Sequence, residues 1–167
     1  PNDTYTEASL IESGATQPGR LGYDYWNSTD GADWYKIVVP EEGRVVFSTH
    51  SDATLRLGGL SVNALVDGEL KYRSSKDMDA YGKDTTIVHT VENMAAGTYY
   101  VYVPRYDGYG GYTLTYAFEA CATANDPEPN GEYTEASLIE NGATQPGRLG
   151  YDYWNSTDRF DWYKIVV

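Results

Sequence analysis

The sequence predicts an all-β protein, an antiparallel β-sandwich or barrel whose unit is repeated along the chain. Tyrosine and glycine each occur 17 times, and Tyr, Val and Thr favour half-buried pleated surfaces over helices. Short segments of alternating apolar and polar residues are separated by turns rich in Gly, Pro and Asp, and they amount to about eight or nine strands. The sequence offers no helical crossover of the kind that parallel strands need.

The first half of the unit begins with a polar lead-in, in which residues 6–12 fit a short helical turn and a strand equally well. Three strands are predicted after it, at 20–23, 33–39 and 44–49. The first of these follows a turn at Pro18-Gly19. The other two are predicted to pair as a hairpin across the turn at 40–43.

The second half contains shorter strands and ends with the most strand-like segments. Its strands are predicted at 55–60, 62–66, 70–73, 85–91, 98–103 and 112–118. The Asp67-Gly68 turn closes a hairpin, and residues 105–111 are predicted to form a loop rich in Tyr and Gly. In the last strand, one face carries Tyr112, Leu114, Tyr116 and Phe118.

The chain carries an internal repeat of domain size. Residue 129 corresponds to residue 1, an offset of 128, and 34 of the 39 positions in 1–39 and 129–167 are identical. The five differing pairs are Asp3/Gly131, Thr4/Glu132, Ser13/Asn141, Gly31/Arg159 and Ala32/Phe160. A period this long predicts units that each have a core. We expect a complete unit at 1–120, an acidic, Pro-containing linker at 121–128 and the first part of a second unit at 129–167.

The second copy stops within an apolar strand at Val167. A fragment of about two or three strands buries too little surface to fold alone. We therefore expect it to be continued by further sequence, or to be completed by a strand of a neighbouring molecule as in donor-strand assembly.

The acidic composition limits the classes of partner. The formal net charge of −13 and the pI of about 4.3 disfavour nucleic acid and anionic lipid, and no apolar run approaches membrane-spanning length. The same charge attracts divalent cations, or it serves only to keep a secreted protein soluble. The sequence holds one cysteine, Cys121, and no nucleophile elbow, HExxH, CxxC or phosphate loop, so we predict no enzymatic activity.

Five short motifs follow one another in a fixed order. They are Pro1-Asn2-Asp3-Thr4, Asp30 with Asp33-Trp34-Tyr35-Lys36-Ile37, Pro40-Glu41-Glu42-Gly43, Ala96-Gly97-Thr98-Tyr99-Tyr100-Val101 and Gly110-Gly111-Tyr112-Thr113-Leu114. In this order they resemble the bacterial pre-peptidase C-terminal domain, and the collagen-binding domains of clostridial collagenases look like relatives of it. The resemblance covers residues 1–119 and again 127–167. It implies an antiparallel jelly-roll-like sandwich that is extracellular, not catalytic, and acts as a spacer, stabiliser or binding module.

Two groups of side chains are candidate ligands for Ca²⁺, the one cofactor that we expect. At the linker, Asp126, Glu128 and Asn130 alternate with prolines, so that their oxygen atoms are placed to converge. The resemblance adds Asp158 and Asp161 to this group. In the first unit it implies a matching set, made of Asn2, Asp3, Asp30 and Asp33. In the second copy Gly131 replaces Asp3, and Glu132 is an alternative ligand there. A solvated acidic linker without metal is the competing interpretation.

Further candidates belong to loops. Asn2, Asn27 and Asn155 begin Asn-x-Ser/Thr triplets, which are either glycosylation sites or chance matches. Tyr106, Tyr109 and Tyr112 are a candidate surface for carbohydrate or for contacts between units, or they only pack within a hairpin.

These features predict a structural repeat that is secreted and lies outside the cell or on its surface. It would be a unit of a filament, stalk or adhesin shaft with calcium-stiffened joints, and its partners would be neighbouring repeats or other copies. The alternatives are a module that binds polysaccharide or a matrix protein, and an appendage of a secreted peptidase. Near-identical tandem copies are unusual for a peptidase tail, which favours the structural array.

Overall fold

A computed structural model of the chain describes residues 2–25, 28–77, 82–121, 130–147, 149, 152–153, 156–157 and 159–166. In the first unit these residues form one short 3₁₀ helix and twelve strands. They are η1 (Tyr5–Glu7), β1 (Ser9–Leu10), β2 (Thr16–Leu21), β3 (Asp24–Tyr25), β4 (Ser28–Thr29), β5 (Ala32–Val39), β6 (Gly43–Ser51), β7 (Leu55–Leu57), β8 (Gly59–Val66), β9 (Glu69–Asp77), β10 (Thr86–Met94), β11 (Gly97–Gly108) and β12 (Gly110–Ala120).

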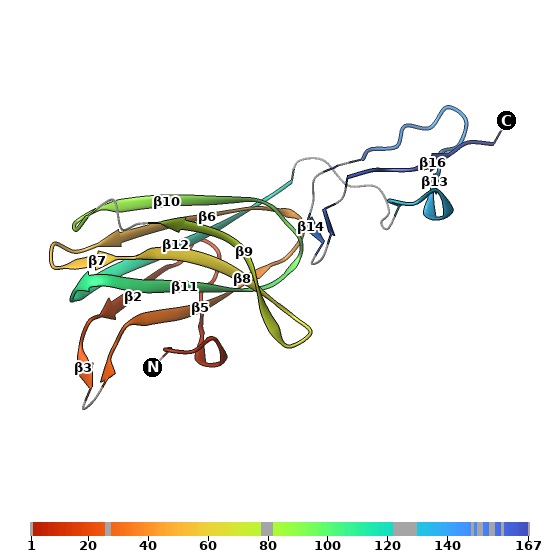
Figure 1. Cartoon of the computed structure of the whole chain (residues 1–167). Helices are drawn as coiled ribbons and strands as arrows, with labels where there is room; N and C mark the ends of the chain where they lie inside the picture. The colour runs from red at the N-terminus through yellow and green to blue at the C-terminus, as the bar shows by residue number, and fades with distance from the viewer. Residues whose placement is uncertain are drawn as a thin grey trace.

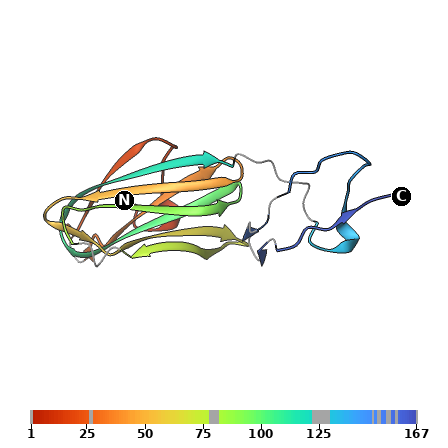
Figure 2. The same ribbon diagram turned by 90° about the horizontal axis from the view of Figure 1, so that it is seen from above.

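Two sheets form the body of the first unit, and their long strands run along a common axis in two layers (Figures 1 and 2). One sheet has the strand order β1-β5-β11-β8-β9, with β7 also paired to β11, and the other has the order β10-β6-β12-β2. All of these pairs are antiparallel except β1 with β5, which is parallel. The predicted all-β sandwich is thereby confirmed.

The core lies between the two sheets, because alternate residues of each strand point inward. On β5 the buried side chains are Asp33, Tyr35, Ile37 and Val39, and on β12 they are Tyr112, Leu114 and Tyr116. Buried tyrosines need partners for their hydroxyls. The Tyr116 hydroxyl donates to the carbonyl of Val38 at 2.8 Å, and the Tyr99 hydroxyl donates to the carbonyl of Ala95 at 2.9 Å.

The hairpin predicted across residues 40–43 is wrong. β5 pairs with β1 and β11, whereas β6 pairs with β10 and β12. The turn therefore carries the chain from one sheet to the other. Both strands bury one full face, and packing these faces against each other across the interior covers more apolar surface than placing the strands side by side.

The turn predicted at Pro18-Gly19 is also wrong, because both residues lie inside β2. Proline is tolerated there since β2 is an edge strand of its sheet. Glycine is required there because a Cβ on Gly19 would overlap the ring of Tyr112. The undecided segment 6–12 contains both alternatives, the end of η1 and then β1.

The segment predicted as a loop over 105–111 is almost entirely strand. β11 runs to Gly108 and β12 begins at Gly110, so only Tyr109 separates them where a loop over 105–111 was predicted. β9 and β10 also run beyond the strands predicted at 70–73 and 85–91, to Asp77 and Met94. Gly108 and Gly110 have φ angles of 76° and 154°, and this freedom of glycine is what permits so tight a connection.

The second copy repeats the local pairings of the first. Its elements are η2 (Tyr133–Glu135), β13 (Ser137–Leu138), β14 (Asp152–Tyr153), β15 (Ser156–Thr157) and β16 (Tyr163–Lys164). Ser137 lies opposite Tyr163 in a parallel pair, as Ser9 lies opposite Tyr35. The packing differs, however. Ile37 is fully buried, while its counterpart Ile165 is 70% exposed.

The described residues include no helix with the length and apolar character needed to cross a membrane.

Candidate metal centre

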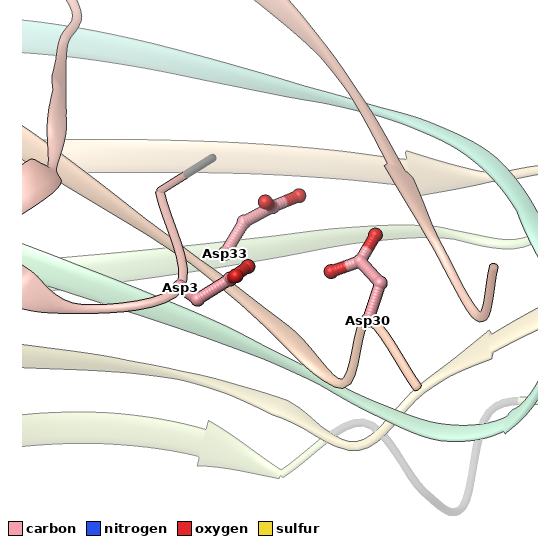
Figure 3. A group of neighbouring side chains, drawn as sticks. All are labelled: Asp3, Asp30 and Asp33. Atoms are coloured by element: carbon pink, nitrogen blue, oxygen red, sulfur yellow. The ribbon is translucent and has the colours of Figure 1, made fainter. Parts of the chain in front are cut away.

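Three carboxylates from different segments converge beside β5 (Figure 3). Asp3 belongs to the lead-in, Asp30 to the connection between β4 and β5, and Asp33 to β5 itself. One oxygen of each lies within 4.8 Å of the others. Among the residues that the structure describes, this is the one group of three or more acidic, histidine or cysteine side chains that converges in this way.

The backbone around the cluster explains why the three side chains meet. The side-chain amide of Asn2 donates to the carbonyl of Trp34 at 3.0 Å, and the Trp34 amide donates back to the carbonyl of Asn2 at 2.7 Å. These two bonds hold the lead-in along β5, so that Asp3 lies next to Asp33. Asp30 is held by its own backbone, which pairs with Gly22 at 2.8 Å and with Tyr23 at 3.0 Å.

Asp33 is the buried member of the cluster, with 6% of its surface exposed. One of its oxygens accepts a hydrogen bond of 2.6 Å from the Tyr112 hydroxyl. The hydroxyl of Tyr35 lies 2.6 Å from that of Tyr112. Burial raises the pKa of Asp33, and the bond from Tyr112 counteracts part of that rise. Burial also raises the pKa of Tyr35 to about 12 and raises the pKa of Tyr112, so both phenols remain protonated.

Asp30 has a carboxylate oxygen whose hydrogen-bonding capacity is not satisfied. Its Oδ1 atom is inaccessible to solvent and has no hydrogen-bond partner. Burial, and then the negative charges of Asp33 and Asp3, raise the pKa of Asp30 to about 6, while Arg105 lowers it. A buried carboxylate oxygen without a partner is unfavourable, and carboxylate oxygens alone are the donors that hard cations such as Ca²⁺ prefer. The donor set therefore fits a hard divalent cation.

Of the ligands predicted in the first unit, Asp3, Asp30 and Asp33 come together, and the linker set is only partly described. Asp126, Glu128 and Asp158 lie outside the described residues. Asn130 is fully buried, and its carbonyl accepts from the Trp162 amide at 2.9 Å, as Asn2 accepts from Trp34. A carboxylate oxygen of Asp161 accepts from the Tyr163 hydroxyl at 3.3 Å.

The structure describes one of the three glycosylation candidates. Asn27 and Asn155 lie outside the described residues. The side-chain nitrogen of Asn2 is the atom that a glycan would occupy, and it donates to the carbonyl of Trp34. A glycan on Asn2 would therefore compete with the contact that holds the lead-in.

One of the three tyrosines predicted to form a binding surface is buried. Tyr112 is 4% exposed and points into the core, whereas Tyr106 and Tyr109 are 57% and 59% exposed. The sequence contained a signal for this, because Tyr112 shares a strand face with Leu114. The guanidinium of Arg56 lies 4.3 Å from the ring centre of Tyr106. Tyr109 meets the edge of another tyrosine, Tyr23, at 6.2 Å between ring centres.

Sequence reasoning missed three residues near these exposed rings: Arg20, Tyr23 and Arg56. The Arg20 guanidinium lies 4.4 Å from the ring centre of Tyr23. Arg20 lies on β2, Tyr23 follows β2, and Arg56 lies on β7. They reach the rings from distant parts of the chain, and no spacing in the sequence marks that.

Comparisons with known proteins give structural similarity only. No protein-family model matches the chain, and no curated protein matches it significantly. The pre-peptidase C-terminal domain of a collagenase from Bacillus anthracis is 23% identical, with a TM-score of 0.49 over 65% of this chain and 93% of that one. A xylan-binding domain from Paenibacillus barcinonensis is 10% identical, with a TM-score of 0.36 over 65% and 85%.

A carbohydrate-binding module of a Cellvibrio mixtus lichenase, solved in complex with cellotriose, is 18% identical, with a TM-score of 0.30 over 62% of this chain and 84% of that module. At these identities and scores, the similarities assign neither a family nor a function to the chain.

Proposed function

We propose that this chain is a non-catalytic, extracellular structural repeat whose entry segment is braced by a calcium ion at Asp3, Asp30 and Asp33. The observation that carries the proposal is the convergence of one carboxylate from the lead-in with two from the sandwich, within 4.8 Å. A cation between them would join the segment that enters the unit to the sheet that forms its body.

The position of the site in the repeat supports a role at the joint between units. In the second copy, the residues matching the lead-in follow directly after the linker at 121–128. A cation held by a lead-in therefore acts next to the connection between one unit and the next. A braced joint stiffens an array, as a filament, stalk or adhesin shaft requires, and the partners of each unit are then its neighbours.

The chemistry of the donors supports calcium over other divalent ions. The three side chains offer only oxygen, which disfavours zinc and copper. They also differ in exposure, from the buried Asp33 to the exposed Asp3. Ca²⁺ accepts irregular sets of oxygen ligands, whereas Mg²⁺ demands near-octahedral geometry and keeps several waters.

Thermal unfolding in calcium and in EGTA tests the metal site. Calcium at about 100 times its Kd stabilises the folded state by about 2.7 kcal/mol, which for a unit of this size is a rise in Tm on the order of 10 °C. We expect Asp3→Asn to remove most of this rise. Glu41→Gln is the matched control, since it removes an exposed carboxylate on the turn after β5. An equal Tm in calcium and EGTA would exclude the site.

Electron microscopy of the native assembly tests the array. We expect thin filaments with an axial repeat that matches one sandwich and its linker, and we expect EGTA to make them more curved. Isolated globular particles in calcium would contradict the structural role.

A second candidate function rests on the exposed rings of Tyr106 and Tyr109. Exposed tyrosines beside guanidinium groups are suited to stacking against sugars or to contacting a matrix protein. Glycan and collagen arrays test this function, with Tyr106→Ala/Tyr109→Ala as the comparison. Retention that the double variant loses supports it, whereas no retention of the unmodified chain excludes it.

A further inference from the structure

Two arginines of the first unit have no acidic partner, although acidic residues outnumber basic ones in the chain by 25 to 12. Arg44 forms ion pairs with Glu119 and Glu92, at 2.6 and 3.9 Å. Arg20 and Arg56 form no ion pair with a carboxylate that the structure describes. Each of them lies over a tyrosine ring instead. Their positive charges are therefore available to an acidic ligand.

Both arginines lie at the same end of the sandwich, where β2 and β7 flank the connection between β11 and β12 (Figure 1). Arg20 lies opposite Gly111 on β12, and Arg56 lies opposite Asp107 on β11. These two partners are four positions apart in the sequence, so their Cα atoms are at most about 14 Å apart. One extended ligand can therefore reach both arginines.

Two carboxylates beside this connection are already bound within the unit. Asp107 forms an ion pair with Lys83 at 3.9 Å. Asp52 accepts hydrogen bonds from three backbone amides, and that of Gly111 is the shortest at 2.6 Å. Both carboxylates are thus engaged without the two arginines.

A guanidinium that lies over a ring keeps its edge for a ligand. Its N–H groups point outward in the plane, as a fork that fits the two oxygens of a carboxylate. Beside the guanidiniums, the rings of Tyr106 and Tyr109 are more than half exposed, and such rings pack well against a ligand that is apolar on one side and polar at its edge.

A sugar acid combines the two features that this surface can recognise. Its carboxylate is attached directly to a ring, so the ring can lie on a tyrosine while the carboxylate meets a guanidinium. A neutral sugar would leave both guanidiniums without an acceptor of opposite charge. An acidic peptide has carboxylates, but it carries them on flexible side chains.

The net charge of the chain does not exclude such a ligand. A charge of −13 opposes the approach of a polyanion from a distance. At physiological ionic strength, however, interactions between exposed charges are largely screened beyond about 8 Å. The groups in direct contact with the ligand therefore decide whether it binds.

We propose that the surface formed by Arg20, Tyr23, Arg56, Tyr106 and Tyr109 binds polysaccharides whose sugars carry carboxylates. The two arginines pair with the carboxylates, and the exposed tyrosine rings contact the sugar rings. This inference rests on the second candidate function, and it names the class of sugar that the exposed tyrosines take.

Titration calorimetry with oligogalacturonate and with its methyl ester tests the proposal. The two ligands share one backbone and differ in charge. EGTA is present throughout, so that calcium cannot bridge carboxylates of the ligand and the protein. We expect the acid to bind at least about tenfold more tightly than the ester, because only the acid forms charge-assisted hydrogen bonds with the guanidiniums.

Variants locate the binding on the chain. Arg20→Gln and Arg56→Gln should each weaken the binding of oligogalacturonate about tenfold. Arg44→Gln is the matched control, because it changes the net charge equally but removes an arginine that is already paired with Glu119. It should leave the affinity unchanged. Circular dichroism establishes that each variant is folded, and if Arg56→Gln is not, Arg20→Gln decides alone, since Arg20 is exposed.

The outcomes separate this inference from the function on which it rests. If glycan and collagen arrays retain nothing, both fail. If the arrays retain the chain through Tyr106 and Tyr109 but the ester binds as tightly as the acid, or Arg44→Gln weakens binding as much as Arg20→Gln, the candidate function stands and the preference for sugar acids is overturned. Displacement of oligogalacturonate by an equal concentration of polyglutamate carboxylates would also overturn it, because carboxylates would then bind without a sugar ring.

Discussion

The hydroxyl of Tyr112 donates a 2.6 Å hydrogen bond to the carboxylate of Asp33 across the interior of the sandwich. Tyr112 lies on β12 in one sheet and Asp33 lies on β5 in the other. Because a phenol carries one proton, the 2.6 Å contact between Tyr112 and Tyr35 must use the proton of Tyr35. A chain of two donated bonds thus connects the core to the carboxylate cluster.

Replacing Tyr112 by phenylalanine tests this connection. The change leaves a buried carboxylate without its donor, which lowers the free energy of unfolding by about 1–3 kcal/mol. Chemical denaturation measures the loss. Tyr35→Phe is the control, since it leaves the bond to Asp33 in place and should cost less. An equal fall in the free energy of unfolding in the two variants would show that the bond to Asp33 stabilises the fold no more than the contact between the two tyrosines does.

A second prediction concerns the close packing of β2 on β12. A Cβ on Gly19 would overlap the ring of Tyr112, so Gly19→Ala should displace that ring and destabilise the unit by about 1–3 kcal/mol. Gly58→Ala is the control, because its Cβ would meet its nearest neighbour, Pro104, at 3.6 Å. Thermal unfolding compares the two, and a loss of similar size in both would contradict this account of the contact.

A third prediction concerns Asp52, which organises the loop between β6 and β7. Its Oδ2 accepts from the Gly111 amide at 2.6 Å, and its Oδ1 accepts from the amides of Thr54 and Leu55 at 3.0 and 3.1 Å. These hydrogen bonds lower the pKa of Asp52, and the bond from Gly111 has the largest effect. A carboxyl with a lowered folded pKa stabilises the fold above its unfolded pKa, and that stability is lost as the pH falls through the folded pKa.

The loss at Asp52 should therefore begin near its unfolded pKa of about 3.9 and continue below it. Asp30 acts in the opposite sense and at higher pH, because its pKa is raised to about 6. The difference in stability between the unmodified chain and Asp52→Asn below about pH 4 therefore reports on Asp52. We expect Asp52→Asn to be less stable than the unmodified chain at neutral pH and to lose less stability below pH 4. Parallel curves of Tm against pH would contradict this.

A fourth prediction compares equivalent residues of the two copies. Ile37 is fully buried and Ile165 is 70% exposed. Ile37→Ala should therefore lower the free energy of unfolding by about 2–5 kcal/mol, whereas Ile165→Ala should change it by no more than about 0.5 kcal/mol. Denaturation of the two variants measures both values, and a large loss in Ile165→Ala would mean that the second copy has a core of its own in this chain.

The strands of the core could be predicted from the sequence because their alternation is strong. The inward face of β12 is an example, since Leu114 and Tyr116 are buried as their spacing indicates. The pairing of strands could not be predicted in the same way. The turn at 40–43 fits a hairpin and a crossing between sheets equally well, and the choice depends on packing between residues far apart in the chain.

The cluster was predicted in part. Asp3, Asp30 and Asp33 were candidates through a resemblance, while the tie through Asn2 and Trp34 that brings them together is a feature of the folded backbone. The role of Tyr112 was missed because its loop-like neighbours, Gly110 and Gly111, suggested an exposed position. Its partner Asp33 is 79 residues away in the chain, a separation that no local pattern spans.

Calorimetric titration of calcium into the chain and into Asp30→Asn tests the central claim most directly. The account predicts one calcium site per chain, with an affinity that Asp30→Asn lowers about tenfold or more, since the number of charged ligands sets calcium affinity. It also predicts that Asp30→Asn is at least as stable as the unmodified chain in EGTA, because the change removes the charge of a half-buried carboxylate that lies close to Asp3 and Asp33. No heat of binding, or an affinity that Asp30→Asn leaves unchanged, would contradict it.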